Sequence, residues 1–352
     1  MELTLKEVYQ GKRVFLTGHT GFKGAWMWAW LHRLGAITKG YSLAPYTQRD
    51  IYTVIDGDTL GESVIADIRD KQRLEEEIID FQPDFIFHLA AQPLVRESYQ
   101  NPIETYETNV MGTAHLLEAV RKLERNCQVV IITTDKVYEN KEWDYPYREN
   151  DRLGGHDPYS ASKAAAELVV SSYRNSFFHA SKFQTHKKGI AVARAGNVIG
   201  GGDWSEHRLL PDIIRYVEKN QTILIRNPFA VRPWQHVLEP VSGYLMLGMR
   251  LEENPVKFSQ AYNFGPWQQD TLTVEEIVKK VINLWGKGSY IIEKDANAPH
   301  EAGLLKLDIS KTVREIGWVP KLNSELALSF TLNWYSSFDF KRETYIQIER
   351  YL

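Results

Sequence analysis

Two residues whose side chains could together move a proton lie one helical turn apart. Tyr159 and Lys163 occur within the segment PYSASKAAAE, and a spacing of four residues brings both side chains to one face of a helix. A nearby ammonium favours the phenolate and lowers the pKa of a tyrosine from about 10 towards working pH. Such a phenolate can accept the proton of an alcohol while the carbon-bound hydride leaves for a nicotinamide. Pairs with this spacing are common on protein surfaces, so the interpretation depends on the surrounding fold.

A second polar group follows an apolar run upstream. Thr134 ends the strand-like run QVVIITT, and Asp135 and Lys136 follow it directly. Polar residues at the carboxyl end of a central strand point into the cleft of an α/β protein, although capping of the strand end is the simpler alternative. With Tyr159 and Lys163, these groups are more than simple alcohol oxidation needs. They favour a reaction with further proton transfers, such as elimination of water.

A glycine-rich turn predicts a nucleotide site. Gly18, Gly21 and Gly24 occur in GHTGFKG, between the apolar run RVFLT and a helical segment. Glycines allow a tight turn there and bring backbone amides close to a pyrophosphate at the positive end of the helix. The spacing differs from the usual G-x-G-x-x-G fingerprint. Its place between a first strand and a first helix nevertheless predicts nucleotide binding rather than a plain loop.

The residues alone leave the identity of the dinucleotide open. The second strand ends in GYSL and lacks an acidic residue for the ribose hydroxyls. Asp67, after the third strand, could contact adenine or could cap the next helix. Arg49 could favour a 2′-phosphate, although a single surface arginine is more often solvated.

Alternating apolar strands and helices position these residues. Strands are expected at 13–17, 37–42, 62–66, 84–89, 128–134 and 189–195, and helices at 24–34, 71–80, 106–123 and 157–176. Continuous apolar strands separated by helices indicate a parallel sheet covered on both faces. The predicted fold is therefore α/β, a Rossmann-type doubly wound parallel sheet.

After about residue 199 the alternation loosens. Gly, Pro, Trp and Arg appear in long connections, and further elements are expected at 273–284, 290–293 and 324–335. We expect a smaller α/β substrate-binding region at 199–233 and 266–352, beside an NAD-binding domain at 1–198 and about 234–265. A cleft between the two is the natural place for chemistry, because open α/β sheets bind ligands at the carboxyl ends of their strands.

Composition narrows the function classes. The 352 residues carry a net charge of -3, with acidic and basic residues interleaved, so neither a nucleic acid nor a membrane is expected as a partner. The single cysteine, Cys127, excludes an internal disulfide and a cysteine-rich metal site, and no metal is expected. The start MELTLKEVYQGKR has no apolar signal-peptide core, and no stretch approaches the ~18 apolar residues of a membrane span. A cytoplasmic protein is expected.

Longer motifs, in the same order, resemble a known family. They are HLAAQPLV after the fourth strand, the helical NVMGT, the runs RAGNVIGGGDW and RLLPD, and RNPFAVRPWQHV. Together with the glycine turn and the Tyr159/Lys163 pair, they are similar to the extended short-chain dehydrogenase/reductase family and, within it, to the nucleotide-sugar 4,6-dehydratases. The resemblance covers nearly the whole chain. The segments TGHTGFKG, GGGDW and RPWQHVLEP are most similar to members that act on a cytidine-diphosphate sugar.

The resemblance implies a three-step reaction on a nucleotide-sugar substrate, with NAD as the cofactor and deoxysugar precursors of O-antigens as the destination. Tyr159 would deprotonate the 4-hydroxyl of the glucose as hydride passes from C4 to NAD. A base would then remove the C5 proton while the 6-hydroxyl leaves as water, and the hydride would return to C6. Thr134 would hydrogen-bond near the 4-hydroxyl, and Asp135 would protonate the departing 6-hydroxyl.

The C5 base departs from the family pattern. Related dTDP-glucose enzymes commonly have a glutamate base at the position of Lys136. Lys136 would need a lowered pKa to act as a base, or it could instead steady the enolate. Glu139 is a weaker candidate for the base.

The resemblance also implies two sets of binding residues. Those expected to hold NAD are Gly18, His19, Gly21, Phe22, Lys23, Gly24, Asp67, Ile68, Arg69, Ala90, Ala91, Gln92, Asn109, Thr133, Tyr159 and Lys163. Those expected to hold the sugar nucleotide are Arg96, Asn197, Arg208, Arg226, Arg232 and His300, the arginine forks being suited to phosphates. Helices 106–123 and 157–176 resemble the pair through which the family dimerises, so a homodimer is expected, with a tetramer as the alternative.

Other functions compete with this interpretation. A nucleotide-sugar 4-epimerase uses the same Tyr/Lys pair and NAD but needs no acid for a 6-hydroxyl, so Asp135 and Lys136 argue against it. A dehydratase for a dTDP-, GDP- or UDP-sugar would differ in the nucleotide alone. A non-catalytic nucleotide-sensing protein would be expected to have lost Thr134, Asp135, Tyr159 or Lys163, and all four are present.

Overall fold

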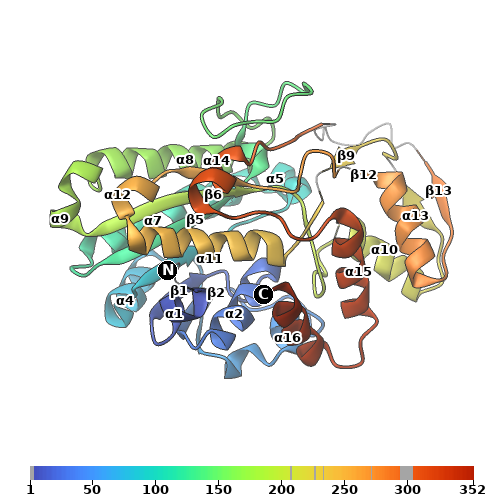
Figure 1. Cartoon of the computed structure of the whole chain (residues 1–352), viewed down its shortest axis with the longest axis horizontal. Helices are drawn as coiled ribbons and strands as arrows, with labels where there is room; N and C mark the ends of the chain where they lie inside the picture. Colours follow the sequence, from blue (N-terminus) through green and yellow to red (C-terminus); the bar gives the residue numbers. More distant parts are fainter. Residues whose placement is uncertain (1–3, 207, 226, 233, 271, 294–303) are drawn as a thin grey trace.

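The computed structural model describes residues 4–206, 208–225, 227–232, 234–270, 272–293 and 304–352, and its centre is a seven-stranded parallel sheet (Figure 1). The strands lie in the order β11-β6-β5-β4-β1-β2-β3, and each neighbouring pair is parallel. Their bounds are β1 (Arg13–Thr17), β2 (Ile37–Ser42), β3 (Glu62–Ile65), β4 (Phe85–His88), β5 (Cys127–Thr134), β6 (Lys188–Ala195) and β11 (Ala261–Phe264). The expected Rossmann-type fold is confirmed. The chain order reverses between β1 and β4, where doubly wound sheets bind their ligands.

Helices cover both faces of the sheet (Figure 1). On one face, α4, α7 and α8 enclose a core that includes Leu74, Leu116 and Val170. On the other face, α1, α2 and α11 share a larger core with the second half of the chain. The bounds of these helices are α1 (Leu5–Tyr9), α2 (Phe22–Arg33), α4 (Lys71–Phe81), α7 (Gly112–Lys122), α8 (Pro158–Ser176) and α11 (Leu238–Glu253). Every residue of β5 and β6 is buried, which explains why both strands are mainly apolar.

A smaller region stands beyond one end of the sheet, on the right in Figure 1. Here β8 pairs with β13 in parallel and β9 pairs with β12 antiparallel, while β7 and β10 form a third small pair. The last helix, α16, returns to pack on α2, beside the central sheet. Bounds in this region are β7 (Val198–Ile199), α10 (Leu209–Glu218), β8 (Ile223–Ile225), β9 (Val231–Arg232), β10 (Gln235–His236), β12 (Leu272–Thr273), α13 (Val274–Trp285), β13 (Tyr290–Ile292), α15 (Ser324–Tyr335) and α16 (Phe340–Tyr351).

The helix expected at 106–123 runs without a break but contains a π-helical turn. The structure has a short α6, a π-helical turn at Glu107–Met111 and then α7. π-helical turns insert one residue into a helix and often occur at functional sites, and this one carries Asn109. The remaining short helices are α3 (Ile51–Val54), α5 (Val95–Gln100), α6 (Pro102–Tyr106), α9 (Phe183–His186), α12 (Pro255–Phe258) and α14 (Ser310–Ile316). Within the described ranges, every helix is too short or too polar to cross a bilayer.

Candidate active site

The glycine turn after β1 forms a cradle at the start of α2. Gly18 has a φ of +76°, and a Cβ there would lie 2.7 Å from the backbone nitrogen of Ala90. A Cβ at Gly24 would lie 1.9 Å from the carbonyl oxygen of Gly18, so neither position accepts a side chain without a shift. Gly21 begins the helix with no side-chain cap, and its Cβ position is almost open. The uncapped amides and the close backbone approach fit a pyrophosphate group.

The side chains between these glycines face different surroundings. His19 is fully buried, its Nε2 lies 2.8 Å from Ser63 Oγ, and its ring packs on Trp28. Burial lowers the pKa of His19 to about 4, so the ring is neutral and turned into the core, and its backbone is what remains for a cofactor. Phe22 packs beside the buried Gly200.

Lys23 stands close to the other cations of the site. Its Nζ lies 6.0 Å from the ring centre of Tyr244. Burial, together with the charges of Arg208 and Lys163, lowers the pKa of Lys23 to about 7. An ammonium with so low a pKa gains proton affinity when an anion binds beside it. This placement therefore also fits a pyrophosphate at the turn.

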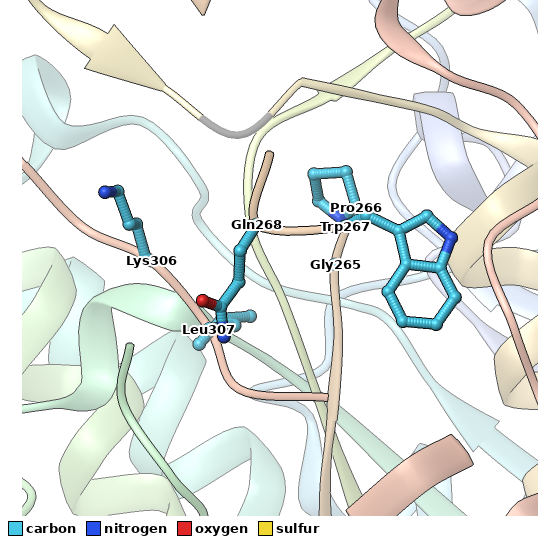
Figure 2. Close-up of a pocket in the computed structure, with 7 residues that line it drawn as sticks. Gly265, Pro266, Trp267, Gln268, Lys306 and Leu307 are labelled. Carbon is cyan, nitrogen blue, oxygen red and sulfur yellow. The ribbon is translucent and has the colours of Figure 1, made fainter. Parts of the chain in front are cut away.

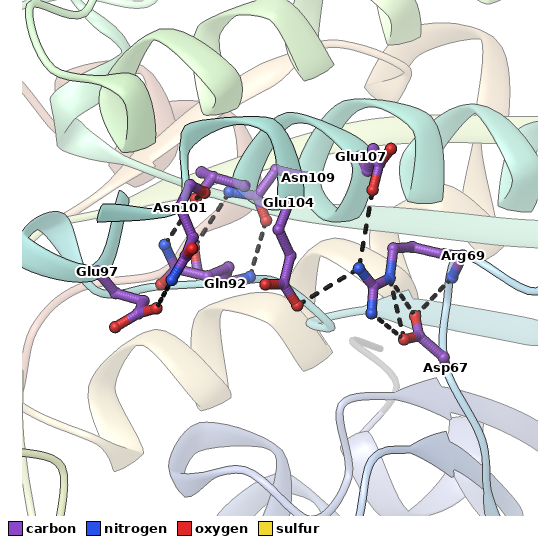
Figure 3. A network of polar contacts seen from close by, with 9 residues as sticks. Asp67, Arg69, Gln92, Glu97, Asn101, Glu104, Glu107 and Asn109 are labelled. Carbon is purple, nitrogen blue, oxygen red and sulfur yellow. Dashed lines mark hydrogen bonds and ion pairs between the residues drawn. The ribbon is translucent and has the colours of Figure 1, made fainter. Parts of the chain in front are cut away.

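The segment after β3 places Asp67 beside Arg69, as Figure 3 shows. The Asp67 carboxylate accepts hydrogen bonds from the Arg69 backbone (2.8 Å) and from Arg69 Nη2 (2.6 Å). These bonds lower the pKa of Asp67. The Arg69 guanidinium also reaches Glu104 (3.4 Å) and Glu107 (3.8 Å) near the π-helical turn. Ile68 is buried and packs against Gly112.

The turn after β4 is held by the π-helical turn. Asn109 Oδ1 accepts from the Gln92 backbone (2.8 Å), and Asn109 Nδ2 donates to the Gln92 carbonyl (3.1 Å) and to Ser162 Oγ (2.8 Å). Ala90 donates its N–H to Thr17 Oγ1, and Ala91 lies between the two anchored residues. Asn109 thereby fixes this turn to α8, which carries Tyr159 and Lys163.

The end of β2 carries no acidic residue, and its neighbour Arg49 is already engaged. Ser42 Oγ lies 2.8 Å from Thr20 Oγ1. The Arg49 guanidinium lies 3.5 Å from the ring centre of Trp204 and 2.7 Å from a Glu218 carboxylate oxygen. Because Arg49 is paired and stacked, it is not a free cation for a 2′-phosphate.

Tyr159 and Lys163 lie in the first turns of α8. The helix begins with Pro158 at its first position, and Asp157 caps it by accepting from the Ser160 N–H at 2.9 Å. Cap and proline fix where the helix starts. Lys163 is buried, and its Nζ donates to the carbonyl oxygen of Ile132 at 2.9 Å. The pair is thus anchored against the end of β5, as the spacing predicts.

The electrostatics of this pair differ from the expectation that lysine lowers the tyrosine pKa towards neutrality. Burial raises the pKa of Tyr159 to about 12, opposed by a hydrogen bond with Thr134 and by the positive charge of Arg208. Burial also lowers the pKa of Lys163 to about 8, opposed by the charge of Glu167. In the protein alone, desolvation is the largest influence on the pKa of both groups.

The acid–base segment, Thr134–Lys136, ends β5 and enters a short 3₁₀ turn at Asp135–Val137. Thr134 Oγ1 donates to Asp135 Oδ1 at 2.9 Å, and Asp135 is 1% exposed. Lys136 Nζ lies 3.7 Å from Asp135 Oδ1 and 3.5 Å from Asn197 Oδ1. The segment and Asn197 therefore meet at one place.

Two neighbours of this segment have other commitments. The Glu139 carboxylate pairs with the Arg152 guanidinium (3.5 Å) and with Lys141 Nζ (3.9 Å), and both cations lie on the loop that follows. Thr133 donates to Glu167 at 2.6 Å, so its hydroxyl is committed to the protein interior.

The residues expected to bind the sugar nucleotide are only partly described. Arg208 caps α10 and pairs with the buried Asp203 at 3.0 Å. Arg96 lies half-buried on α5, and Arg232 lies on β9 with its side chain outside the description. Arg226 and His300 fall outside the described residues.

A small pocket beside Asn197 was missed by sequence reasoning (Figure 2). It is lined by Gly196, Gly265, Pro266, Trp267, Gln268, Lys306 and Leu307. Gly265 follows directly on β11, and carboxyl ends of parallel strands are where ligands bind in such sheets. That rule, applied to the last strand, would have pointed to these residues. In the described part of the chain, no group of three or more His, Cys, Asp or Glu residues could hold a metal.

Comparison with known proteins gives one family and consistent relatives. The family model described as GDP-mannose 4,6 dehydratase matches residues 15–329. The chain is 52% identical over 332 residues to the CDP-glucose 4,6-dehydratase of Salmonella typhimurium, covering 94% of this chain and 92% of that protein.

Solved structures agree on the fold. DesIV, a dTDP-glucose 4,6-dehydratase from Streptomyces venezuelae solved with NAD, matches with a TM-score of 0.77 at 25% identity and covers 92% of this chain and 96% of its own. The UDP-glucose 4-epimerase of Thermotoga maritima, solved with UDP-glucose, also has a TM-score of 0.77, at 21% identity, covering 92% and 98% of the two chains. The backbone alone therefore does not separate dehydratases from epimerases.

Proposed function

Since the chain belongs to the GDP-mannose 4,6 dehydratase family, we propose that it catalyses the NAD-dependent 4,6-dehydration of CDP-D-glucose to CDP-4-keto-6-deoxy-D-glucose. The choice of CDP as the nucleotide rests on the 52% identity to a CDP-glucose 4,6-dehydratase along 94% of the chain. The observation that favours dehydration over epimerisation is the buried Asp135 beside Lys136, because epimerisation needs no acid for a 6-hydroxyl. The protein is thus a hydro-lyase of nucleotide sugars.

NAD fits the site on three features of the chain. The glycine cradle accepts a pyrophosphate, Asn109 fixes the turn after β4, and Arg49 is unavailable for a 2′-phosphate. Bound NAD would supply the acceptor for the hydride of C4 and the donor for C6, and its positive charge would favour the Tyr159 phenolate. Gly18, Gly21 and Gly24 would approach the pyrophosphate, and Asp67 and Ile68 would lie against the adenosine.

Tyr159 is the proposed base for the 4-hydroxyl. Because burial raises its pKa to about 12 in the protein alone, the phenol stays protonated until further positive charge enters the site. Lys163, with a pKa lowered to about 8 by burial, keeps its charge at neutral pH. Thr134, whose hydrogen bond lowers the Tyr159 pKa, would orient the same sugar hydroxyl.

Asp135 and Lys136 are the proposed groups for elimination. Asp135 would give its proton to the departing 6-hydroxyl, and Lys136, as the neutral amine, would take the proton of C5. The contacts of Lys136 with Asp135 and Asn197 favour it over Glu139, which is paired with Lys141 and Arg152. A Lys136→Met variant tests this role. It should still oxidise C4 but should fail to exchange the C5 hydrogen with deuterated solvent, and unchanged exchange would move the role elsewhere.

The sugar nucleotide is proposed to bind between the cofactor half (1–198 with about 234–265) and the substrate half (199–233 with 266–352). Arg208 is well placed for a phosphate, since Asp203 orients it beside the site. Asn197, Arg96, Arg226, Arg232 and His300 complete the proposed set.

We propose a homodimer in the cytoplasm. Exposed apolar side chains gather on α6, the following π-helical turn and α8: Ile103 is 70%, Met111 49% and Leu168 62% exposed. Such a face is unusual for a solvated surface and suits a helix pair packed against its copy. Nucleotide sugars and NAD are cytoplasmic metabolites, which supports the location.

The test is incubation of the purified protein with NAD and CDP-glucose, then with dTDP-, UDP- and GDP-glucose, followed by mass spectrometry. Loss of one water from CDP-glucose alone is expected. A new stereoisomer of unchanged mass would indicate an epimerase, and loss of water from another nucleotide sugar would change the substrate. If NAD binds but no sugar gives a product, the result would favour a non-catalytic nucleotide-sensing protein.

A further inference from the structure

A buried ion pair lies directly behind the acid–base segment. Glu167, one helical turn after Lys163 on α8, is 5% exposed, and Arg194 on β6 is 3% exposed. Arg194 Nε donates to Glu167 Oε1 at 2.9 Å, and Arg194 Nη2 donates to Glu167 Oε2 at 2.5 Å. This two-pronged geometry fixes both side chains in orientation as well as distance.

The pair holds the acid–base segment at both ends. Before the segment, Thr133 Oγ1 donates to Glu167 Oε1 at 2.6 Å. After the segment, Arg194 Nη1 donates to the Tyr138 hydroxyl at 2.7 Å. Thr134, Asp135 and Lys136 lie between these two anchors, so one ion pair sets where the segment starts and where it ends.

Tyr138 connects the ion pair to the rest of the site. Its hydroxyl donates to Asn263 Oδ1 at 2.7 Å, and its ring stacks on Tyr147 at 5.1 Å. Asn263 Nδ2 in turn donates to the Tyr147 carbonyl at 2.9 Å. β11, β6 and the loop after the segment thus meet at one tyrosine hydroxyl.

Stability alone does not account for this arrangement. A buried ion pair gains little over a well-packed apolar replacement, because desolvation cancels most of its attraction. What the ion pair contributes is a fixed geometry, because a buried polar network whose groups are all hydrogen-bonded holds a single arrangement. The segment is also where geometry matters, because a small misplacement of acid–base groups slows proton transfer strongly.

We propose that Glu167, Arg194 and Tyr138 are positioning residues that keep the acid–base segment aligned with Tyr159 and Lys163, so that elimination follows oxidation on the same bound sugar. The inference rests on the proposed dehydration. Loosening the anchor at Tyr138 moves Asp135 and Lys136, whereas Tyr159 and Lys163 stay fixed on α8. Oxidation at C4 then continues while loss of water becomes slow.

The experiment uses Tyr138→Phe, which keeps the stacked ring and removes the hydroxyl. We expect kcat to fall about 10- to 100-fold with KM nearly unchanged. Reduced nicotinamide should accumulate during turnover, seen by its near-ultraviolet absorbance, and mixing experiments should show a normal oxidation phase. Tyr173→Phe is the matched control. It also removes one tyrosine hydroxyl, which on α8 donates a hydrogen bond to Glu118 (2.8 Å), far from the acid–base segment. The control should match wild type in every measurement.

A second variant, Glu167→Gln, tests the other anchor and should show the same accumulation, together with a slower oxidation phase, because the charge of Glu167 raises the pKa of Lys163. Wild-type kinetics in Tyr138→Phe would overturn the inference. So would a lower kcat with no accumulated reduced cofactor, because that pattern is a general loss of folded enzyme. Wild-type protein that leaves CDP-glucose intact would instead overturn the proposed function, and the two failures are told apart in the same assay.

Discussion

Two glutamates are buried in helices on opposite faces of the sheet, and their hydrogen-bond partners differ. Glu167 on α8 meets a guanidinium, Arg194, and lies beside the acid–base segment. Glu239 on α11 meets only uncharged donors: the Tyr351 hydroxyl at 2.6 Å and the backbone N–H groups of Lys321 and Leu322 at 2.8 and 2.5 Å. Burial raises the pKa of Glu239.

The difference separates a role in chemistry from a role in assembly. Glu167 joins α8 to Thr133 on β5 and to Arg194 on β6, beside the acid–base segment. The Glu239 contacts tie α11 to the chain before α15 and to the last helix, α16, far from the acid–base segment. A carboxylate that only joins two elements needs hydrogen-bond donors of any kind. A carboxylate that sets the geometry of a site gains more from a guanidinium, because the N–H groups of a guanidinium point in fixed directions.

The largest effect should come from the chemical side. Tyr159→Phe should lower kcat about 1000-fold, because it removes the proposed base for the 4-hydroxyl. Its thermal midpoint should equal that of wild type, since the Tyr159 hydroxyl serves the substrate. Steady-state kinetics and calorimetry on the same preparation check both. Substantial residual turnover would place the base elsewhere.

On the assembly side, Glu239→Ala should cost about 3 kcal/mol of unfolding free energy, because it leaves buried donors without an acceptor. The folded fraction should keep wild-type kcat at moderate temperature. Denaturant midpoints and active-site titration measure the two quantities. If kcat fell together with stability, the proposed separation of the two glutamates would be wrong.

A smaller effect concerns pH. For an acid whose folded pKa is raised, the contribution to stability is complete below its ordinary value of 4.5 and is lost as pH rises through the folded value. The thermal midpoint of wild type relative to Glu239→Gln should therefore fall as pH increases above 4.5. Glutamine does not titrate, so the difference isolates this group. A difference that stays flat with pH would mean that the carboxyl pKa is not raised.

The smallest effect should come from an exposed ion pair on the same last helix. Glu349 pairs with Arg33 at 2.8 Å, and both side chains are 53% exposed. Glu349→Gln should change the unfolding free energy by less than about 0.5 kcal/mol, because solvent screens such pairs. Comparing this variant with Glu239→Ala by denaturant titration shows how much burial, rather than helix identity, determines the cost.

Much of the cofactor half could be predicted because its signals are local. The runs RVFLT and ITKGYS give β1 and β2 with the same bounds as the structure, and the Tyr/Lys spacing gives one face of α8. In contrast, α11 is buried on every side, including Pro240 and Gly243, so its sequence has no polar face to mark a period. α16 is rich in charged residues and depends on its contact with α2.

The site was predictable in its residue types but not in its inward contacts. The fate of His19 depends on Ser63, which the parallel pairing of β2 with β3 brings near. The partnership of Glu167 with Arg194 likewise depends on how α8 packs across β5 and β6. One local signal did exist: Arg194 interrupts the apolar run GIAVARA, and a charge inside a buried strand requires a buried partner.

The π-helical turn at Glu107–Met111 limits how the length of this helix can change in evolution. A single inserted residue rotates everything beyond it by about 100° relative to an unbroken helix. The exposed Ile103 lies before the turn, and the core residue Leu116 lies after it. A one-residue deletion here would make a more regular helix, yet it would swing Asn109 away from Gln92 or turn the apolar surface face inward. Substitutions can therefore accumulate in this helix, while changes in its length should be rare.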